Sequence, residues 1–206
     1  MIWSPSETLH GLRRTCLANS RIRRTVTMRS MGSTDDRIRA ANFEGSSVGR
    51  MSWAALLGVE NWFRRAGISD PELDRWLDHL WQWSTVHPKT FDSWYQGRPD
   101  LVGLRDRLPE NLQAQCDAVG LSAEDLRTAI KAVSEVIYVN LFGAITWDWV
   151  TEELDRLAEI LSKYELGLPS PDCLPSSTSR EGYGWGNHLD ARVVDEIRAL
   201  PWTTGC

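Results

Sequence analysis

A run of apolar residues at helical spacing, between residues 126 and 141, most constrains how this chain can fold. The run consists of Leu126, Ile130, Val133, Ile137 and Leu141, at steps of four, three, four and four. Such steps place all five side chains on one face of an α-helix. A second stripe with the same spacing follows from Trp147 to Tyr164. The two stripes predict helices that bury their apolar faces in a common core.

Capping residues and proline predict two further helices before this pair. A helix over about 52–66 is expected to end at Gly67, because glycine readily adopts the left-handed conformation found after many helices. Ser69 and Glu72 form the pattern of a capping box, which predicts the start of the next helix. That helix is expected to end at His87-Pro88, because the residue before a proline avoids the helical region.

The sequence also predicts caps for the two helices that carry the stripes, and it contains three shorter apolar segments. Ser122 is expected to cap the helix that carries the first stripe, and Thr146 the helix that carries the second. Three segments with short apolar periods lie before Ser122, over residues 90–96, 100–108 and 110–119.

The chain is therefore expected to be all-α: an irregular bundle of about six or seven helices, with a long Gly/Pro/Ser loop before a C-terminal helix. The helical domain is expected over 51–206, with the loop at 167–186 and the closing helix at 187–201. One alternative remains open at 136–142, VIYVNLF. This segment is apolar on nearly all sides and rich in β-branched residues, so it fits either a central helix or a strand.

Residues 1–50 differ in composition from the rest of the chain. They hold nine arginines and four acidic residues, a net charge of +5, whereas residues 51–206 carry a net charge of −10. Few apolar residues recur there with any period, which is typical of a disordered extension. We expect such an extension or a stretch that is not translated, with Met31 or Met51 as the native start. A nucleic-acid-binding or targeting arm is the alternative.

Charge and cysteine spacing exclude several classes of function. Phosphate binding needs clustered cations, so the acidic body disfavours nucleic acid as the main partner and suits a basic protein. No apolar run approaches the roughly 20 residues that cross a membrane. The four cysteines, Cys16, Cys116, Cys173 and Cys206, form no CxxC pair. We therefore expect no metal and no cofactor, and free thiols in the cytoplasm.

The chain contains eleven tryptophans, and eight of them lie between residues 53 and 149. Tryptophan is enriched both in cores and in protein-binding hot spots. In the stretch ELDRWLDHLWQWSTVHP, residues 72–88, helical spacing assigns Trp76 to the core and places two other tryptophans at the edges of that face. The aromatic residues expected to bind a partner are Trp81, Trp83, Trp149, Tyr183 and Trp185.

The motif GYGWGN, residues 182–187, is the most suggestive short stretch. It precedes an expected helix, whose N-terminus could bind an anion such as phosphate. However, it lacks the spacing and the preceding strand of a dinucleotide-binding motif, and the Lys-Ser/Thr pair of a P-loop. The loop is otherwise interpreted as an aromatic segment folded onto the core, or as a partner-binding loop.

Sequence motifs of known enzyme classes, such as GxSxG and HExxH, are absent. A small helical enzyme or small-ligand-binding protein remains the alternative function, and its candidate residues are His79, His87, His188, Glu153 and Asn140. A deep cavity that gathers two or more of these groups would favour it. Asp74 and Asp78 stand four residues apart, a spacing that suits a metal pair but is more typical of a solvated helix face.

These observations favour an acidic, cytoplasmic protein-interaction module over an enzyme. An inhibitor or immunity-type protein that masks a basic partner is one form that such a module would take.

Overall fold

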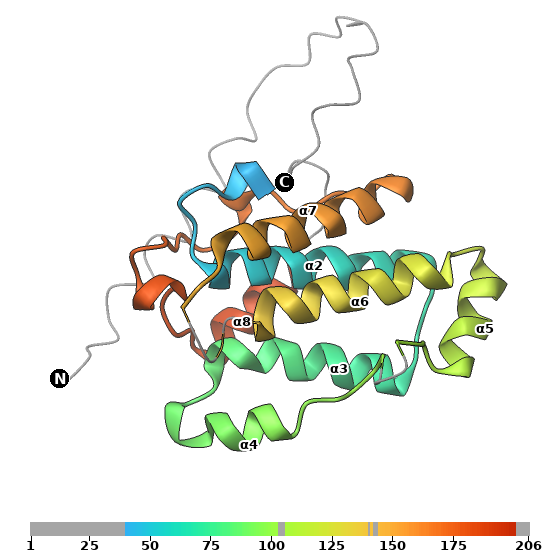
Figure 1. The fold of residues 1–206 in the computed structure, drawn as a ribbon, viewed down its shortest axis with the longest axis horizontal. Coiled ribbons are helices and arrows are strands. Elements are labelled where there is room, and N and C mark those ends of the chain that lie inside the picture. The colour runs from blue at the N-terminus through green and yellow to red at the C-terminus, as the bar shows by residue number, and fades with distance from the viewer. Residues whose placement is uncertain (1–39, 103–105, 140, 142–143, 201–206) are drawn as a thin grey trace, which may run out of the picture. The chain divides into compact units, whose positions relative to one another are not determined.

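The structure is a computed structural model that describes residues 40–102, 106–139, 141 and 144–200 (Figure 1). All of them belong to the unit Arg37–Cys206. Within these ranges the chain forms seven α-helices and no β-strand, so the predicted all-α class is confirmed for the described residues. The helices are α2 (Val48–Ala66), α3 (Pro71–Gln82), α4 (Phe91–Gln96), α5 (Glu110–Val119), α6 (Ala123–Tyr138), α7 (Trp147–Lys163) and α8 (Ala191–Arg198).

Helices α2, α6 and α7 pack side by side and form the centre of the bundle (Figure 1). The apolar stripes of α6 and α7 are buried as predicted, with Leu126, Ile137 and Leu154 all at 0% exposure. Helix α2 is buried on nearly all sides. It can lie this close to its neighbours because it carries small residues; Gly58, for example, faces the side chain of Leu161.

Helix α2 begins before its predicted start at about 52. The Ser47 hydroxyl accepts a hydrogen bond from the backbone N–H of Arg50 at 3.1 Å and caps the helix at Val48. Phe43, in the short 3-10 helix η2 (Ala40–Phe43), is also buried. Residues on the N-terminal side of 51 therefore contribute to the fold. The expectations for residues 1–39 lie outside the described residues.

Helix α3 begins where the sequence predicted, but a different residue caps it. The Asp70 carboxylate, not the Ser69 hydroxyl, accepts from the backbone N–H groups of Glu72 and Leu73, at 2.8 and 3.3 Å. Its other oxygen accepts from the side-chain amide of Asn111 in α5. A charged acceptor makes a stronger cap than a hydroxyl, and here the same carboxylate also attaches α5 to α3.

The structure shows the secondary structure of two segments, 136–142 and 100–108, in their described parts. Helix α6 includes residues 136–138, and none of the described residues in 136–142 lies in a strand, so the strand alternative is wrong for that part. The described part of 100–108 is not helical, and Asp106 has a left-handed backbone with φ of 56°. Leu101 and Leu108 are both buried, so the leucine spacing there reflects anchors of an irregular connection.

The closing helix is shorter than the predicted 187–201. Asp190 caps α8 by accepting from the backbone N–H of Arg192 at 2.8 Å. At the other end of α8, Arg198 donates to Glu60 of α2 at 2.9 Å and to Asp78 of α3 at 2.7 Å. These ion pairs hold α8 against both helices.

Candidate functional site

The connection over residues 167–190 covers the end of the bundle where α2 begins and where α3 and α6 end (Figure 1). It contains only two 3-10 turns, η5 (Pro171–Cys173) and η6 (Gly182–Gly184), which agrees with the predicted lack of regular structure. The Ser47 N–H donates to the carbonyl of Ser177, and the Gly49 N–H to that of Trp185, each at 3.0 Å. The start of α2 thus fixes this connection at two points.

A partly buried network of side chains reinforces this attachment. The Ser47 hydroxyl donates to the Ser177 hydroxyl at 2.8 Å, which donates to Oε2 of Glu181 at 3.1 Å. The same carboxylate oxygen accepts the Thr178 N–H at 3.2 Å and the Asn187 side-chain amide at 3.4 Å. Both serines are buried. Because their hydroxyls are already paired and closed off from solvent, we interpret the network as a structural clamp.

Two glycines of the GYGWGN motif, Gly184 and Gly186, are required by close packing. Gly184 and Gly186 have positive φ angles of 96° and 89°, which side chains rarely tolerate. A Cβ atom at Gly184 would overlap the side chain of Ile145, and one at Gly186 would lie 2.7 Å from the Ser47 hydroxyl. The glycines allow the backbone to approach the bundle, and this places Trp185 at the bundle surface.

An apolar cavity of about 380 Å³ lies between this connection and the end of α3. Trp83 and Trp185 contact each other at one side of it, with ring centroids 5.8 Å apart and planes tilted by 57°. We call this cavity the Trp83–Trp185 pocket. Its lining residues are Trp83, Ser84, Val86, Phe91, Leu141, Trp185, Gly186, Asn187 and His188.

The polar groups of the pocket come mainly from its edge. The backbone carbonyl of Ser84 accepts from Nδ1 of His188 at 3.0 Å and from the Leu189 N–H at 3.1 Å. Because a carbonyl only accepts, Nδ1 of His188 is the donor in this hydrogen bond, which leaves Nε2 free to face the cavity edge. The indole N–H of Trp83 is buried and has no hydrogen-bond partner within the described ranges. The pocket therefore offers apolar surface and, at its edge, the polar side chains of Asn187 and His188.

Tyr183 lies two residues before Trp185 in the chain and is fully exposed. Its φ of 58° lies in the left-handed region, which costs a non-glycine residue conformational energy. Backbone strain of this kind is often found at functional sites. The turn thus presents a whole tyrosine side chain to solvent, two residues before Trp185.

The five aromatic residues predicted to bind a partner do not form one patch. Trp83 and Trp185 meet in the pocket, with Tyr183 close by in the chain. Trp81, by contrast, is buried at 3% exposure, and its indole donates to Glu60 at 2.8 Å, so its expected place in a semi-exposed patch is wrong. Trp149 is exposed, as predicted, but is not among the residues that line the pocket.

Three apolar lining residues were not predicted to form a site: Val86, Phe91 and Leu141, the last of which was expected only in the apolar stripe of α6. Val86 and Leu141 lie a few residues after the ends of α3 and α6, and Phe91 is the first residue of the short helix α4, so helical periodicity alone did not show that they meet. The sequence did give one usable signal, since Phe91 belongs to a short aromatic helix bounded by Pro88 and Gly97.

Of the enzyme candidates within the described ranges, His188 alone lines the pocket. His79 is buried against Trp94, and His87 is exposed, with its Nδ1 accepting from the Lys89 N–H at 3.1 Å. Asn140 lies outside the described residues.

The fifth of these residues, Glu153, is buried at 3% exposure and pairs with Arg156 on the same helix. Burial raises the pKa of Glu135, and the nearby charge of Glu153 adds to this effect. The described part of the chain thus does not gather the enzyme candidates in one cavity.

Metal and thiol chemistry find little support. Asp78 of the Asp74–Asp78 pair is bound to Arg198, and the described residues contain no cluster of His, Cys, Asp or Glu that could hold a metal. Cys116 is a free, buried thiol. Cys173 is disulfide-bonded, so the expectation of free thiols throughout is wrong for this residue.

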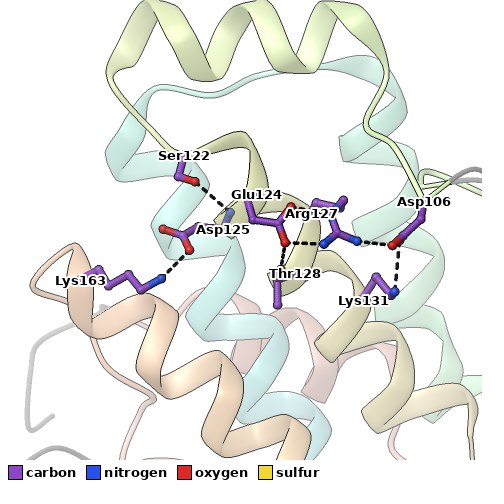
Figure 2. Close-up of polar contacts among 8 residues, drawn as sticks. All are labelled: Asp106, Ser122, Glu124, Asp125, Arg127, Thr128, Lys131 and Lys163. Atoms are coloured by element: carbon purple, nitrogen blue, oxygen red, sulfur yellow. Dashed lines mark hydrogen bonds and ion pairs between the residues drawn. The ribbon is translucent and has the colours of Figure 1, made fainter.

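A second polar cluster surrounds the start of α6 (Figure 2). Arg127 lies between the carboxylates of Glu124 and Asp106, and Lys131 also pairs with Asp106, at 3.1 Å. Both carboxylates are exposed, and their pairing lowers the pKa of each. This cluster is a solvated network at the start of a helix.

No family model, curated protein or solved structure matches this chain. Within the residues that the structure describes, none of the helices has the length and apolar character needed to cross a membrane.

Proposed function

We propose that this protein is an interaction module and that its Trp83–Trp185 pocket receives an apolar side chain of a basic protein partner. The observation that carries the proposal is the pocket itself. Two tryptophans that lie about a hundred residues apart in the sequence meet beside an open apolar cavity of about 380 Å³.

The chemistry of the lining supports a protein partner. Tryptophan and tyrosine are the residues most enriched where a few side chains dominate binding. The pocket combines Trp83 and Trp185 with the neighbouring, fully exposed Tyr183. Tyr183 is therefore proposed as an anchor that contacts the partner beside the pocket.

The charge of the chain supports a basic partner. Residues 51–206 carry a net charge of −10. Such a field attracts cationic proteins and speeds their association. An inhibitor or immunity-type protein that masks a basic partner is the role that best fits a small acidic module with an aromatic pocket.

The expected cytoplasmic location rested on free thiols, and disulfides such as that at Cys173 are rare in a reducing cytosol. The proposal therefore rests on the pocket and the charge and assumes no compartment.

A small apolar ligand is the second candidate. The cavity volume of about 380 Å³ lies within the usual range for ligand pockets. His188 would then orient a polar group of the ligand through Nε2. An enzymatic role has less support, because among the enzyme candidates that the structure describes His188 alone lines the cavity.

The test screens the full-length protein, immobilised, against a random-peptide display library. Wild-type protein is expected to enrich peptides that combine an aromatic or aliphatic residue with Lys or Arg. Val86→Trp puts an indole into the pocket and is expected to weaken binding of these peptides about tenfold or more. Val119→Trp is the matched control, because Val119 is exposed on α5, away from the pocket, and should leave binding unchanged.

Two outcomes would contradict the proposal. Enriched peptides without net positive charge would remove the argument for a basic partner. Equal binding by wild type and Val86→Trp would exclude the pocket. If the protein binds indole, followed by NMR, but enriches no peptide, the second candidate replaces the first.

A further inference from the structure

His79 occupies a buried aromatic site between α3 and α4. It lies in the last turn of α3 and is 9% exposed. Its ring stacks on Trp94 of α4, with centroids 4.8 Å apart and planes within 1°. The Trp94 indole also donates to the backbone carbonyl of His79 at 3.0 Å. His79 therefore holds Trp94 through both its ring and its backbone.

Helix α4 depends on this contact for its position. It has only six residues, and helices this short are not stable alone in water. Trp94 is its one buried residue. Tyr138 of α6 completes the site, with its ring 5.9 Å from Trp94 and 6.0 Å from Tyr95. The attachment of α4 to the bundle thus centres on the stack of Trp94 against His79.

The same helix supplies one wall of the Trp83–Trp185 pocket. Phe91, the first residue of α4, lines that pocket. Its ring lies 5.8 Å from Trp94 and 6.2 Å from Tyr95. A change in the position of Trp94 would therefore move a wall of the pocket.

The surroundings of His79 suit a neutral ring. Its Nε2 atom is buried and has no hydrogen-bond partner among the described residues. The titratable and charged groups that act on it from other elements are Tyr138 of α6, with its ring centroid 6.5 Å away, and Arg98 after α4. Tyr95 of α4 packs against Tyr138. Arg98 lies over the Tyr95 ring at 4.2 Å and carries the same sign of charge as a protonated histidine. On its own helix, the neighbouring Asp78 is engaged by Arg198.

Burial, and then the charge of Arg98, lower the pKa of His79 below its ordinary value of 6.5. One effect acts in the opposite direction, because the face of Trp94 attracts a cation. The desolvated Nε2 without an acceptor and the like charge of Arg98 outweigh it in this geometry.

We propose that His79 is a pH-sensitive latch: the neutral ring holds α4 in place, and protonation releases α4 and opens the Phe91 wall of the pocket. The sign follows from linkage. When α4 is released, His79 regains its ordinary pKa of 6.5, so the released form binds a proton more readily than the closed form. The attachment of α4 to the bundle is thus fully favourable above about pH 6.5 and weakens as the pH falls below that value. The latch does not depend on what the pocket binds.

Hydrogen exchange of the full-length protein tests the latch, with rates corrected for their intrinsic pH dependence. Between about pH 7.5 and about pH 5.5 the opening of α4 amides should increase about tenfold, while α2 amides stay protected. His79→Gln, which cannot be protonated, should abolish this increase. His87→Gln replaces an exposed histidine near α4 and should retain it.

Titration of His79 by NMR in the wild type gives a second measurement that needs no variant. A pKa in the closed protein below the ordinary histidine value supports the latch, and an ordinary or raised value overturns it. The latch is also overturned if α4 exchange does not change with pH, or if His79→Gln folds and shows the same increase as wild type. None of these readouts involves a ligand, so they separate this inference from the proposed function.

Discussion

The centre of the bundle and the 167–190 connection are held by different kinds of contact. In the centre, α2, α6 and α7 meet through apolar stripes in which many side chains share the burial. The connection contributes few buried apolar side chains. It is fixed by single contacts, such as the hydrogen bonds of Ser47 to Ser177 and the close approach at Gly186.

This difference determines what each region tolerates. A stripe accepts other apolar residues of similar volume, because packing is shared among many neighbours. A contact made by one hydroxyl or by one absent Cβ accepts almost no substitute. One side of the pocket is therefore formed by the 167–190 connection, which tolerates few substitutions, and the other by the short helix α4.

The largest expected effect comes from the centre. Ile137→Ala removes a side chain with 0% exposure from α6, and we expect the free energy of unfolding to fall by about 2–5 kcal/mol, since a cavity is left. Urea unfolding measures this loss. Val139→Ala, at an exposed position just after α6, is the control and should change stability little. Equal losses for both would show that the centre is not the tightly packed region.

Gly186 in the connection is expected to lose up to the same amount of stability when it is replaced, and Gly45 to lose less. Gly186 and Gly45 both have positive φ angles, 89° and 75°, but a Cβ at Gly45 has nothing within 4 Å, whereas one at Gly186 meets Ser47 and Ser177. Gly45→Ala should cost about 1–2 kcal/mol from backbone strain alone. Gly186→Ala should cost about 1–3 kcal/mol more, because the overlap must also be relieved.

Urea unfolding of both variants gives the difference. If the two variants lose the same stability, the close approach at Gly186 does not hold the connection.

The sequence predicted the centre well because the centre depends on periodicity. The stripe from Leu126 to Ile137 fixes both a helix and its buried face, and one misplaced residue hardly changes that face. Element ends were less predictable, since they depend on which of two adjacent polar residues caps a helix. Asp70 in place of Ser69 is an example.

The candidate site was only partly predictable, for a physical reason. Trp185 was identified from its place in a glycine-rich motif, and Trp83 from its place at the edge of a helical face. Their contact joins segments about a hundred residues apart, and no local pattern encodes that pairing. Trp81 shows the same limit: its wheel position suggested exposure, but α2 supplies Glu60 as its partner and α8 lies beside it.

The smallest expected effect lies at the start of α6, where ion pairs are exposed to solvent (Figure 2). Arg127→Gln should leave the urea midpoint nearly unchanged, because exposed pairs contribute little to stability. It should nevertheless raise the pKa of Glu124, whose lowering comes first from Arg127. The pKa of Asp106 should rise less, because its lowering comes first from Lys131 and only then from Arg127.

Both carboxylates have lowered pKa values in the folded chain, so the small stabilisation they contribute is present above their unfolded pKa values and is lost as the pH falls through the folded ones. NMR titration of the two side chains in wild type and Arg127→Gln measures these shifts, and added salt should reduce them. A large loss of stability in Arg127→Gln would show that this cluster, like the single contacts of the connection, does not tolerate substitution. Unchanged pKa values would show that the pairs do not persist in solution.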